Sequence, residues 1–367
     1  MNNLKKIGLS ALAGSLVAVS AQAGEMAVTG SYNVTYKTQS GNAGAASTNA
    51  LYTSDHGAGI GNDKDVGFSG SGELDNGWTF AGNTLLKDDF SVSSSALSLT
   101  MGSLGTISTG SQTGGTSTKY DVQTPKAYEE VDDGGAQSLS ANFVGNFLDN
   151  NSLYYTSPAI EMGGMTATLD VEWSPEASGT SPNDGGVQAS TAWGSAASVG
   201  LTLSGQGATF GIYGAERESD DLTVGVRDSF NGVAYLNYTY GPVSVGYSQS
   251  YHDAGTQGTA TAANTDKLVN TATGIFESDT MSVAFNVNDN LSVSYAQADD
   301  TYDAQAAAGE GTSTNVNDVT STMKSIQAAY SMGAMSIKAY RTTTDGVNYN
   351  SAPRESVTTE IALGLAF

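Results

Sequence analysis

Residues 356 to 367 alternate between apolar or β-branched side chains and small or polar ones. The first set is Val357, Thr359, Ile361, Leu363, Leu365 and Phe367. Successive side chains of a β-strand point to opposite faces, so this stretch predicts a strand with one apolar face and one wet face. A strand of roughly 9–11 residues with these faces is the unit of a membrane-spanning barrel. An open apolar edge would aggregate, and the first strand of the mature chain is the expected partner.

The first residues of the chain predict its compartment. Lys5 and Lys6 precede an apolar run that ends near Val19, and an Ala-Gln-Ala cleavage pattern follows. We therefore predict a secretory signal peptide at 1–23 and a single barrel domain at 24–367. The alternative is a membrane helix, but the run is short for a span, which needs about 18 or more apolar residues.

Composition agrees with an exported barrel. The chain has 45 Gly and 18 Tyr, it is 39% hydrophobic, and it contains no Cys, which excludes disulfides and thiolate metal sites. There are 14 Lys and Arg against 37 Asp and Glu, for a net charge of −23. Proteins that bind nucleic acid are basic, so a nucleic-acid partner is not expected. The charge suits a surface that faces cations, although an acidic, salt-tolerant soluble protein would share it.

Alternation with period two recurs along the whole chain. It runs from Met26 to Tyr36, and the Asp75-Asn76-Gly77 turn joins two further runs. Asn-Gly between alternating runs is a strong hairpin signal. Comparable short turns occur at 102–103, 158–164, 205–207, 241–242, 288–290 and 331–334. Seven hairpins and one strand at each end predict sixteen strands.

The connections between these hairpins are mostly long and polar, as at 38–65, 174–196, 252–280 and 297–322. Short turns at one end and long loops at the other are typical of outer-membrane barrels, in which the short turns are periplasmic. The chain is therefore predicted to be all-β, a transmembrane antiparallel β-barrel. Four aromatic residues lie beside short turns or at the chain end, as interfacial aromatics do, although Tyr also favours strands in general. They are Trp78, Tyr240, Tyr330 and Phe367.

Three stretches together resemble the Gram-negative general porins, a family of trimeric sixteen-stranded barrels. They are Leu104 to Gln112, Asn151 to Pro158, and the terminal strand that ends in Phe367. The resemblance implies that the connection between the first two, about 111–150, folds inward and constricts the pore. It also implies a homotrimer in the outer membrane of a Gram-negative bacterium. The family commonly has Arg where this chain has Ser108 and Ser111.

The 111–150 connection is also unusual in its own right, because loops beyond about 12–15 residues in a compact fold are usually functional or disordered. It is rich in acidic residues, and its apolar residues between Leu139 and Leu148 could hold it against the inner wall. The alternative is a long outer loop with a solvated charge run. The candidate acidic side of the constriction is Asp121, Glu129, Glu130, Asp132 and Asp133.

Strand alternation also predicts which basic residues lie on the pore wall. If the apolar residues of each strand face lipid, Lys37, Lys87, Lys338 and Arg217 have inward parity. A single β-bulge would reverse any of these assignments.

No catalytic constellation is evident. The only histidines, His56 and His252, lie in loop-like surroundings without a nucleophile elbow, so an enzyme is not expected.

Metal and cofactor sites are not expected either. Four aspartates beside Gly-rich or loop-like stretches could offer Ca²⁺ oxygen ligands, but the spacing of a calcium loop is absent, and a solvated surface is the prediction. They are Asp63, Asp65, Asp299 and Asp300.

The function that follows from this resemblance is passive diffusion of ions and small hydrophilic solutes through a water-filled channel, with moderate cation selectivity. Its expected partners are outer-membrane lipid and two further copies of the chain. The alternatives are a structural or adhesive outer-membrane surface protein that does not conduct, and a barrel hydrolase.

Overall fold

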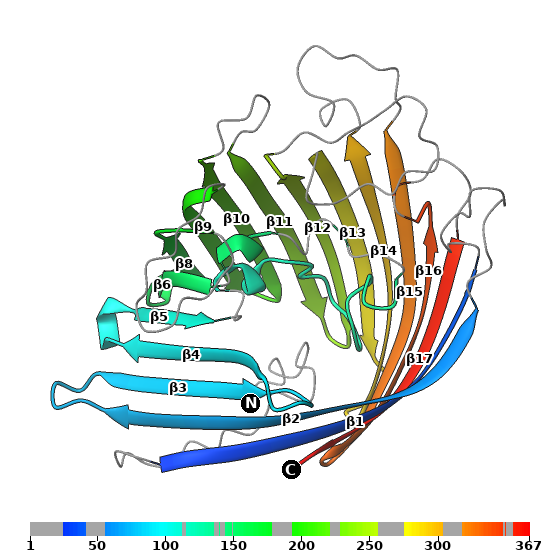
Figure 1. The fold of residues 1–367 in the computed structure, drawn as a ribbon, viewed down its shortest axis with the longest axis horizontal. Coiled ribbons are helices and arrows are strands. Elements are labelled where there is room, and N and C mark those ends of the chain that lie inside the picture. Colours follow the sequence, from blue (N-terminus) through cyan, green and yellow to red (C-terminus); the bar gives the residue numbers. More distant parts are fainter. Residues whose placement is uncertain are drawn as a thin grey trace.

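The computed structural model describes residues 25–41, 56–111, 115–135, 139, 144–148, 150–177, 193–220, 228–255, 275–303, 318–347, 349 and 355–367. The predicted signal peptide at 1–23 lies outside these ranges. Within them the chain forms one antiparallel sheet of seventeen labelled strands (Figure 1). The strands are β1 (Glu25–Gly41), β2 (Gly57–Glu73), β3 (Thr79–Leu86), β4 (Val92–Thr100), β5 (Thr106–Ser111), β6 (Asn150–Thr156), β7 (Ile160–Met162), β8 (Met165–Ser174), β9 (Trp193–Gly205), β10 (Ala208–Ser219), β11 (Ser229–Tyr240), β12 (Val243–Asp253), β13 (Ile275–Asn286), β14 (Leu291–Asp303), β15 (Val319–Met332), β16 (Met335–Asp345) and β17 (Glu355–Ala366).

The sheet closes on itself. β1 pairs with β2 along one edge and with β17 along the other, from Ser31 opposite Ala366 to Gly41 opposite Ser356. β6 and β7 both pair with β8 and together make one interrupted strand, so the seventeen labels describe the predicted sixteen-stranded barrel. The predicted all-β fold and the pairing of the first strand with the last are confirmed.

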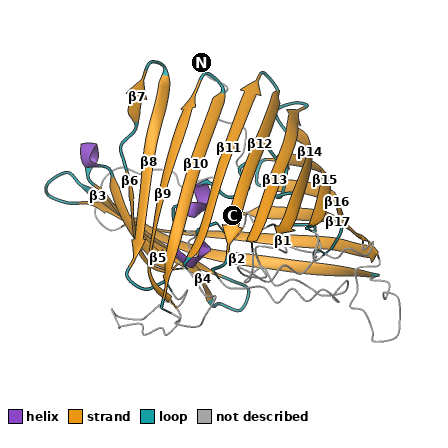
Figure 2. Cartoon of the chain, turned by 90° about the horizontal axis from the view of Figure 1, so that it is seen from above, coloured by secondary structure: helices purple, strands orange, loops and turns teal. Residues whose placement is uncertain are grey.

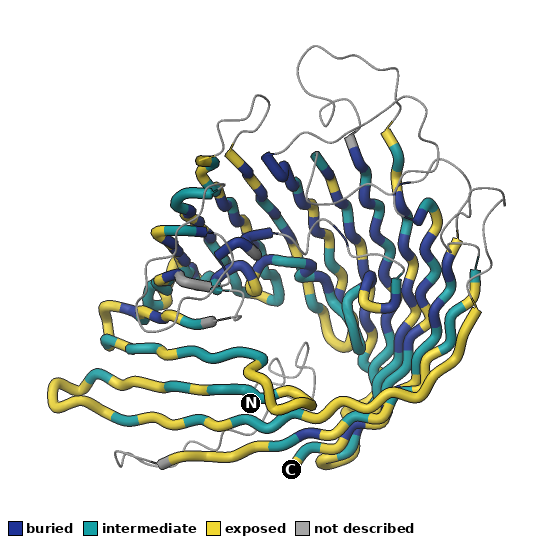
Figure 3. The backbone as a smooth tube through the Cα atoms, viewed as in Figure 1, coloured by how far each residue is buried: buried dark blue, intermediate teal, exposed yellow. Residues whose placement is uncertain are grey.

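The two faces of the wall have opposite character. On β17, Ile361 and Leu363 are exposed on the outside, whereas Thr358 and Ala362 on the inward face are buried. This order is the reverse of a soluble protein, in which the apolar face is buried, and it fits strands that are surrounded by hydrocarbon. Figure 3 shows the same alternation on the neighbouring strands. Among the described residues, no helix is long and apolar enough to cross a membrane.

Several strands extend further than the sequence analysis expected. Asp63 and Asp65 lie within β2, Asp299 and Asp300 lie within β14, and His252 lies within β12, so their assignment to loops was wrong. These parts of the strands continue the backbone ladder beyond the apolar band. At the end of β14, for example, the outward Gln297 and Thr301 are polar while the inward Ala298 is buried in an apolar cluster, so the pattern of apolar outward and polar inward residues is lost. His56 is exposed just before β2.

The wall is uneven in height. β3, β4 and β5 have 8, 9 and 6 residues, whereas β1 and β2 have 17 each. The short strands form one side of the barrel and the longer strands from β9 to β17 form the other (Figure 2).

Aromatic side chains gather near the hairpin ends of the strands. Tyr240 and Phe367 are strongly exposed, and Tyr330 is partly exposed. Phe367 lies at the closing seam, where its backbone N–H and C=O pair with Gly30 at 3.0 and 2.8 Å. Its ring covers Gly30 so closely that a Cβ added there would lie 2.4 Å from Cε2 of Phe367.

We expect Phe367→Ser to reduce the yield of folded barrel several-fold, because it removes the ring that covers the seam between β1 and β17. The fraction that shows heat-modifiable migration in gels measures this yield. Tyr240→Ser is the matched control, since Tyr240 is an equally exposed aromatic beside a hairpin turn away from the seam. A normal folded fraction for Phe367→Ser would contradict the role given to the ring.

Candidate functional site

We call the connection between β5 and β6 (residues 112–149) the inner loop. Its described parts, 115–135, 139 and 144–148, pass along the inward faces of the strands (Figure 1). Apolar residues hold it there in two buried clusters. Val144, Phe147 and Leu148 pack with wall residues that include Tyr213 and Tyr235. The second cluster joins Val122, Val131 and Leu139 to Ala296, Ala298 and Met323.

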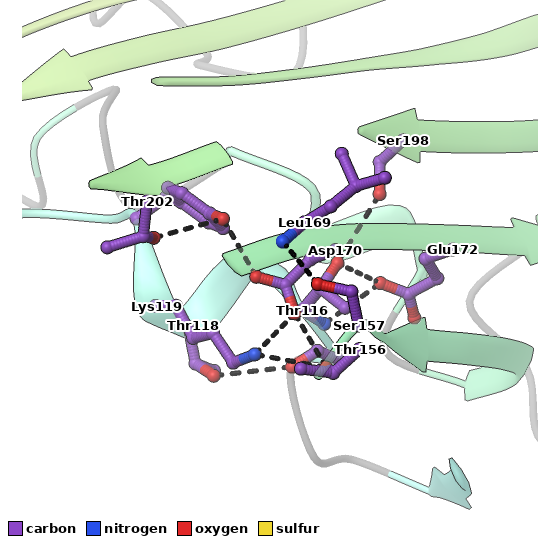
Figure 4. A network of polar contacts seen from close by, with 12 residues as sticks. Thr116, Thr118, Lys119, Thr156, Ser157, Leu169, Asp170, Glu172, Ser198 and Thr202 are labelled. Atoms are coloured by element: carbon purple, nitrogen blue, oxygen red, sulfur yellow. Dashed lines mark hydrogen bonds and ion pairs between the residues drawn. The ribbon is translucent and has the colours of Figure 1, made fainter. Parts of the chain in front are cut away.

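Two fully buried carboxylates of β8 hold the first part of the inner loop (Figure 4). Asp170 forms an ion pair with Lys119, and it accepts hydrogen bonds from the Tyr120 hydroxyl at 2.8 Å and from Thr156 at 2.6 Å. Glu172 accepts hydrogen bonds from the Thr116 backbone N–H at 2.9 Å and from its hydroxyl at 2.8 Å. Buried carboxylates need such partners, because an unpaired buried charge is costly.

A row of directly paired wall residues holds the middle of the inner loop. The row contains one residue from each of five neighbouring strands, in the order Lys37, Glu360, Tyr340, Gln327 and Ser294. The buried Gln327 amide oxygen accepts hydrogen bonds from two backbone N–H groups of the loop, those of residues 128 and 129, at 3.0 and 3.1 Å. Its amide nitrogen donates to the backbone oxygen of residue 129 at 2.7 Å. The Gln327 side chain therefore both accepts from and donates to the loop backbone, as the backbone of a neighbouring strand would.

Tyr128 continues this attachment to β16 and β17, the last two strands of the barrel. Its hydroxyl donates to Oε1 of Glu360 at 3.0 Å, and the Tyr340 hydroxyl donates to Oε2 at 3.1 Å. The two tyrosine rings lie 5.9 Å apart, and the Lys338 ammonium lies 4.8 Å from the Tyr128 ring centroid. The acidic stretch that follows, residues 129–133, is thus fixed close to β15, β16 and β17. We call this stretch the acidic corner.

The structure brings four of the five predicted acidic residues together at this corner, but it gives them different tasks. Asp132 is buried and accepts a hydrogen bond from the Leu139 N–H at 2.8 Å, so it shapes the loop. Glu130 forms an ion pair with Lys126 at 2.5 Å. Asp133 is exposed and accepts a hydrogen bond from the Glu130 N–H at 2.9 Å. Asp121 lies apart from them, next to the Lys119 end of the loop, and is partly exposed.

Burial changes the protonation of this corner. Burial is the main cause that raises the pKa of Glu129 to about 7. The charge of Asp133 and the hydrogen bond between Asp133 and Glu129 raise this pKa further, whereas Lys338 and Lys126 lower it. Burial also raises the pKa of Asp132 to about 7 against the lowering effect of the Leu139 N–H. The pKa of Glu130 is raised by burial, with Lys126 opposing the rise. At neutral pH this corner therefore carries fewer negative charges than its residue count suggests.

The predicted basic residues lie in separate places. The Lys37 ammonium lies 6.0 Å from the Tyr340 ring centroid, near Lys338 and the acidic corner. Arg217 is at the other end of the loop, with its guanidinium 3.6 Å from the Trp193 ring centroid and 4.9 Å from that of Phe147. Its NH1 also donates to the Ala177 backbone oxygen at 3.3 Å. Arg217 thus packs against aromatic rings at the loop's return. Lys87 is exposed in the short connection after β3.

The wall that faces away from these attachments is lined by small polar residues. By strand alternation, the inward positions of β3, β4 and β5 include Asn83, Ser94, Ser98, Thr106 and Ser108. Ser108 is buried and stands where the resemblance would place an Arg. The neutral hydroxyls supply no opposing positive charge at this position.

Sequence reasoning missed the wall residues that attach the loop, which are Asp170, Glu172, Gln327 and Glu360. One signal was available: in the run Thr168-Leu169-Asp170-Val171-Glu172-Trp173 the acidic residues alternate with outward apolar ones. Their role depends on the loop, which alternation cannot place.

The arrangement offers no evident metal centre. In the described parts of the chain, no group of three or more His, Cys, Asp or Glu residues is positioned to hold a metal ion. The expectation that no cofactor is needed remains untested.

Comparison with solved structures shows the same fold in several outer-membrane proteins. OmpT of Vibrio cholerae, folded in vitro and in its trimer form, has 12% identity and a TM-score of 0.58, with 94% of this chain and 100% of that chain covered. OmpF of Salmonella typhi in complex with daunomycin has 11% identity and a TM-score of 0.60, covering 93% and 97%. An anion-selective porin from Comamonas acidovorans has 13% identity and a TM-score of 0.58, covering 94% and 100%.

Comparison with curated protein sequences gives no match. A comparison with family models is decisive. The model for Gram-negative porins matches residues 8–364, which is nearly the whole chain. Together with the closed barrel, this match shows that the chain belongs to the Gram-negative porin family and is a β-barrel protein of the outer membrane.

Proposed function

We propose that this porin is a passive, moderately cation-selective diffusion channel for ions and small hydrophilic solutes. The observation that carries the proposal is the inner loop, which is attached to the inward faces of β8, β11, β14, β15 and β17 and presents carboxylates inside the barrel. A sixteen-stranded barrel leaves an aqueous lumen, so a loop within it narrows the path. Charges that line the narrowest point of a pore select among ions.

The loop acids matter more than acids elsewhere because of screening. At physiological salt a charge acts over about 8 Å, so carboxylates at the outer ends of the strands have little effect on an ion in the lumen. At the acidic corner Asp133 is exposed and Glu129 is partly exposed, while Lys126, Lys338 and Lys37 offset part of the field of the corner. The preference for cations is therefore expected to be moderate and to weaken as salt rises.

Joint neutralisation tests this assignment. We expect Glu129→Gln, Glu130→Gln, Asp132→Asn and Asp133→Asn together to move the zero-current potential in a salt gradient toward anions. The matched control is the same number of changes at exposed acids near the hairpin turns, namely Glu73→Gln, Asp75→Asn, Glu161→Gln and Asp289→Asn. If the loop variant conducts with an unchanged potential, the loop acids do not line the constriction.

The raised carboxyl pKa values predict a pH dependence of selectivity. A carboxyl with a pKa of about 7 is largely neutral at pH 6 and largely ionised at pH 8, whereas ordinary carboxyls are ionised throughout. We therefore expect the cation preference of the wild type to rise between pH 6 and 8. Glu129→Gln should reduce this rise and the double change with Asp132→Asn should abolish it. An undiminished rise in the double variant would assign the titration to other groups.

We further propose that the porin is a homotrimer that associates through the outer face of β1 to β5. This side includes the short strands β3, β4 and β5, and its outward positions include Lys64, Thr84, Ser95 and Thr109 beside Phe68 and Leu97. Contact between polar or charged side chains and hydrocarbon is unfavourable in free energy. Contact with another subunit is therefore more favourable for this face than contact with lipid. The trimer form of OmpT from Vibrio cholerae, a similar barrel, supports the same state here.

Replacing Gly82 tests the interface. Gly82 is outward on β3, and an added Cβ would meet only atoms at 3.7 Å or beyond, so the barrel itself tolerates a side chain. We expect Gly82→Arg to convert trimers into folded monomers, as measured by light scattering in detergent. Gly214→Arg on β10, where a Cβ likewise meets nothing within 3.7 Å, is the control and should stay trimeric. A trimeric Gly82→Arg variant would place the interface elsewhere.

A further inference from the structure

We propose that Glu172 is a positioning residue that joins the two ends of the inner loop and thereby keeps the channel in a steady open state. The proposal rests on the proposed channel function. It concerns the attachment of the loop and is independent of which ions the loop selects.

The geometry shows one side chain in contact with the start of the loop and with the strand that follows its end. At the start of the loop, the Thr116 N–H and hydroxyl both donate to Oε2 of Glu172, at 2.9 and 2.8 Å (Figure 4). Past the other end of the loop, the hydroxyl of Ser152 in β6 lies 2.6 Å from Oε1 of Glu172 and 2.9 Å from the backbone oxygen of Leu148, a residue of the loop. Glu172 thus connects two segments that are separated by the whole loop.

The fit around this carboxylate is tight. Glu172 is fully buried, and Gly115 lies so close that an added Cβ would be 2.1 Å from Oε1. Gly115 also has a φ of +52°, a conformation that favours glycine. Because water is excluded here, the loss of the carboxylate would leave the Thr116 donors without their partner.

The rest of the loop has separate attachments. Gln327 and Glu360 hold the acidic corner on the far side of the barrel, and neither contacts Glu172. Loss of the Glu172 junction is therefore expected to free the ends of the loop while the acidic corner stays on the wall. The open state should become shorter-lived, with its ion selectivity retained.

Substitutions at residue 172 separate geometry from charge. Gln can keep every contact: its oxygen can accept from Thr116, and its NH₂ can donate to the Ser152 oxygen, whose proton then serves Leu148. Ala can keep none of them. We expect Glu172→Ala to shorten open-state lifetimes in planar bilayers by about tenfold, as the loss of one or two buried hydrogen bonds implies, and Glu172→Gln to restore the wild-type lifetime.

The double variant Thr116→Val/Ser152→Ala, which we call the loop-side variant, provides a second route if Glu172→Ala folds poorly, since it leaves Glu172 and β8 unchanged. It should show the same short lifetimes. Glu161→Ala is the control, because Glu161 is an exposed glutamate of β7 that accepts a hydrogen bond from Thr166 at 3.1 Å, away from the described parts of the loop.

The outcomes are distinct. Short lifetimes with unchanged zero-current potential in Glu172→Ala or the loop-side variant, and rescue in Glu172→Gln, support the proposal. Wild-type lifetimes in both disruptive variants, or a Glu172→Gln channel as unsteady as Glu172→Ala, would overturn it. A wild-type protein without conductance would instead refute the proposed function.

Discussion

Closure of the sheet between β1 and β17 is the constraint on which the other features depend. Hydrocarbon offers no hydrogen-bond partners, so every backbone N–H and C=O of a spanning strand must pair within the protein. The ladder from Ser31–Ala366 to Gly41–Ser356 removes the last open edge. It also brings Lys37 of the first strand opposite Glu360 of the last, which adds Lys37 to the row of wall residues beside Tyr128.

The inner loop and the wall satisfy one another's polar groups. The inward face of a porous barrel is wetted, so Asp170, Glu172 and Gln327 can occupy it at little cost before the loop is in place. Once the loop covers them they are buried, and the loop supplies the donors and acceptors that burial requires. The apolar residues Val122, Leu139 and Phe147 add burial that holds the loop against the wall. A polar interior is what allows a loop to be fixed there without closing the lumen.

Alternation with period two was sufficient to predict the strands, their number and the pairing of the first with the last, because lipid and water on the two faces impose the contrast directly. It failed at the strand ends, where Asp63 and Asp299 continue the ladder after the regular outward row of apolar residues has ended. Parity also predicted that Arg217 faces inward. It did not predict that Trp193 and Phe147 enclose its guanidinium, because Phe147 belongs to the loop. The anchors at Asp170 and Glu172 were missed for the same reason.

The same dependence on the loop explains why charge counting overstates the field in the lumen. A net charge of −23 describes the chain, whereas an ion in the lumen responds to the few charges within a Debye length. Of the acids at the corner, Glu130 is paired with Lys126, Asp132 is committed to the Leu139 N–H, and Glu129 is half ionised near pH 7. The carboxyl groups that give the loop its shape therefore contribute less to the negative field that would attract cations. In the channel that we propose, the loop would be firmly fixed but its field would be weak, which is why we expect only moderate selectivity.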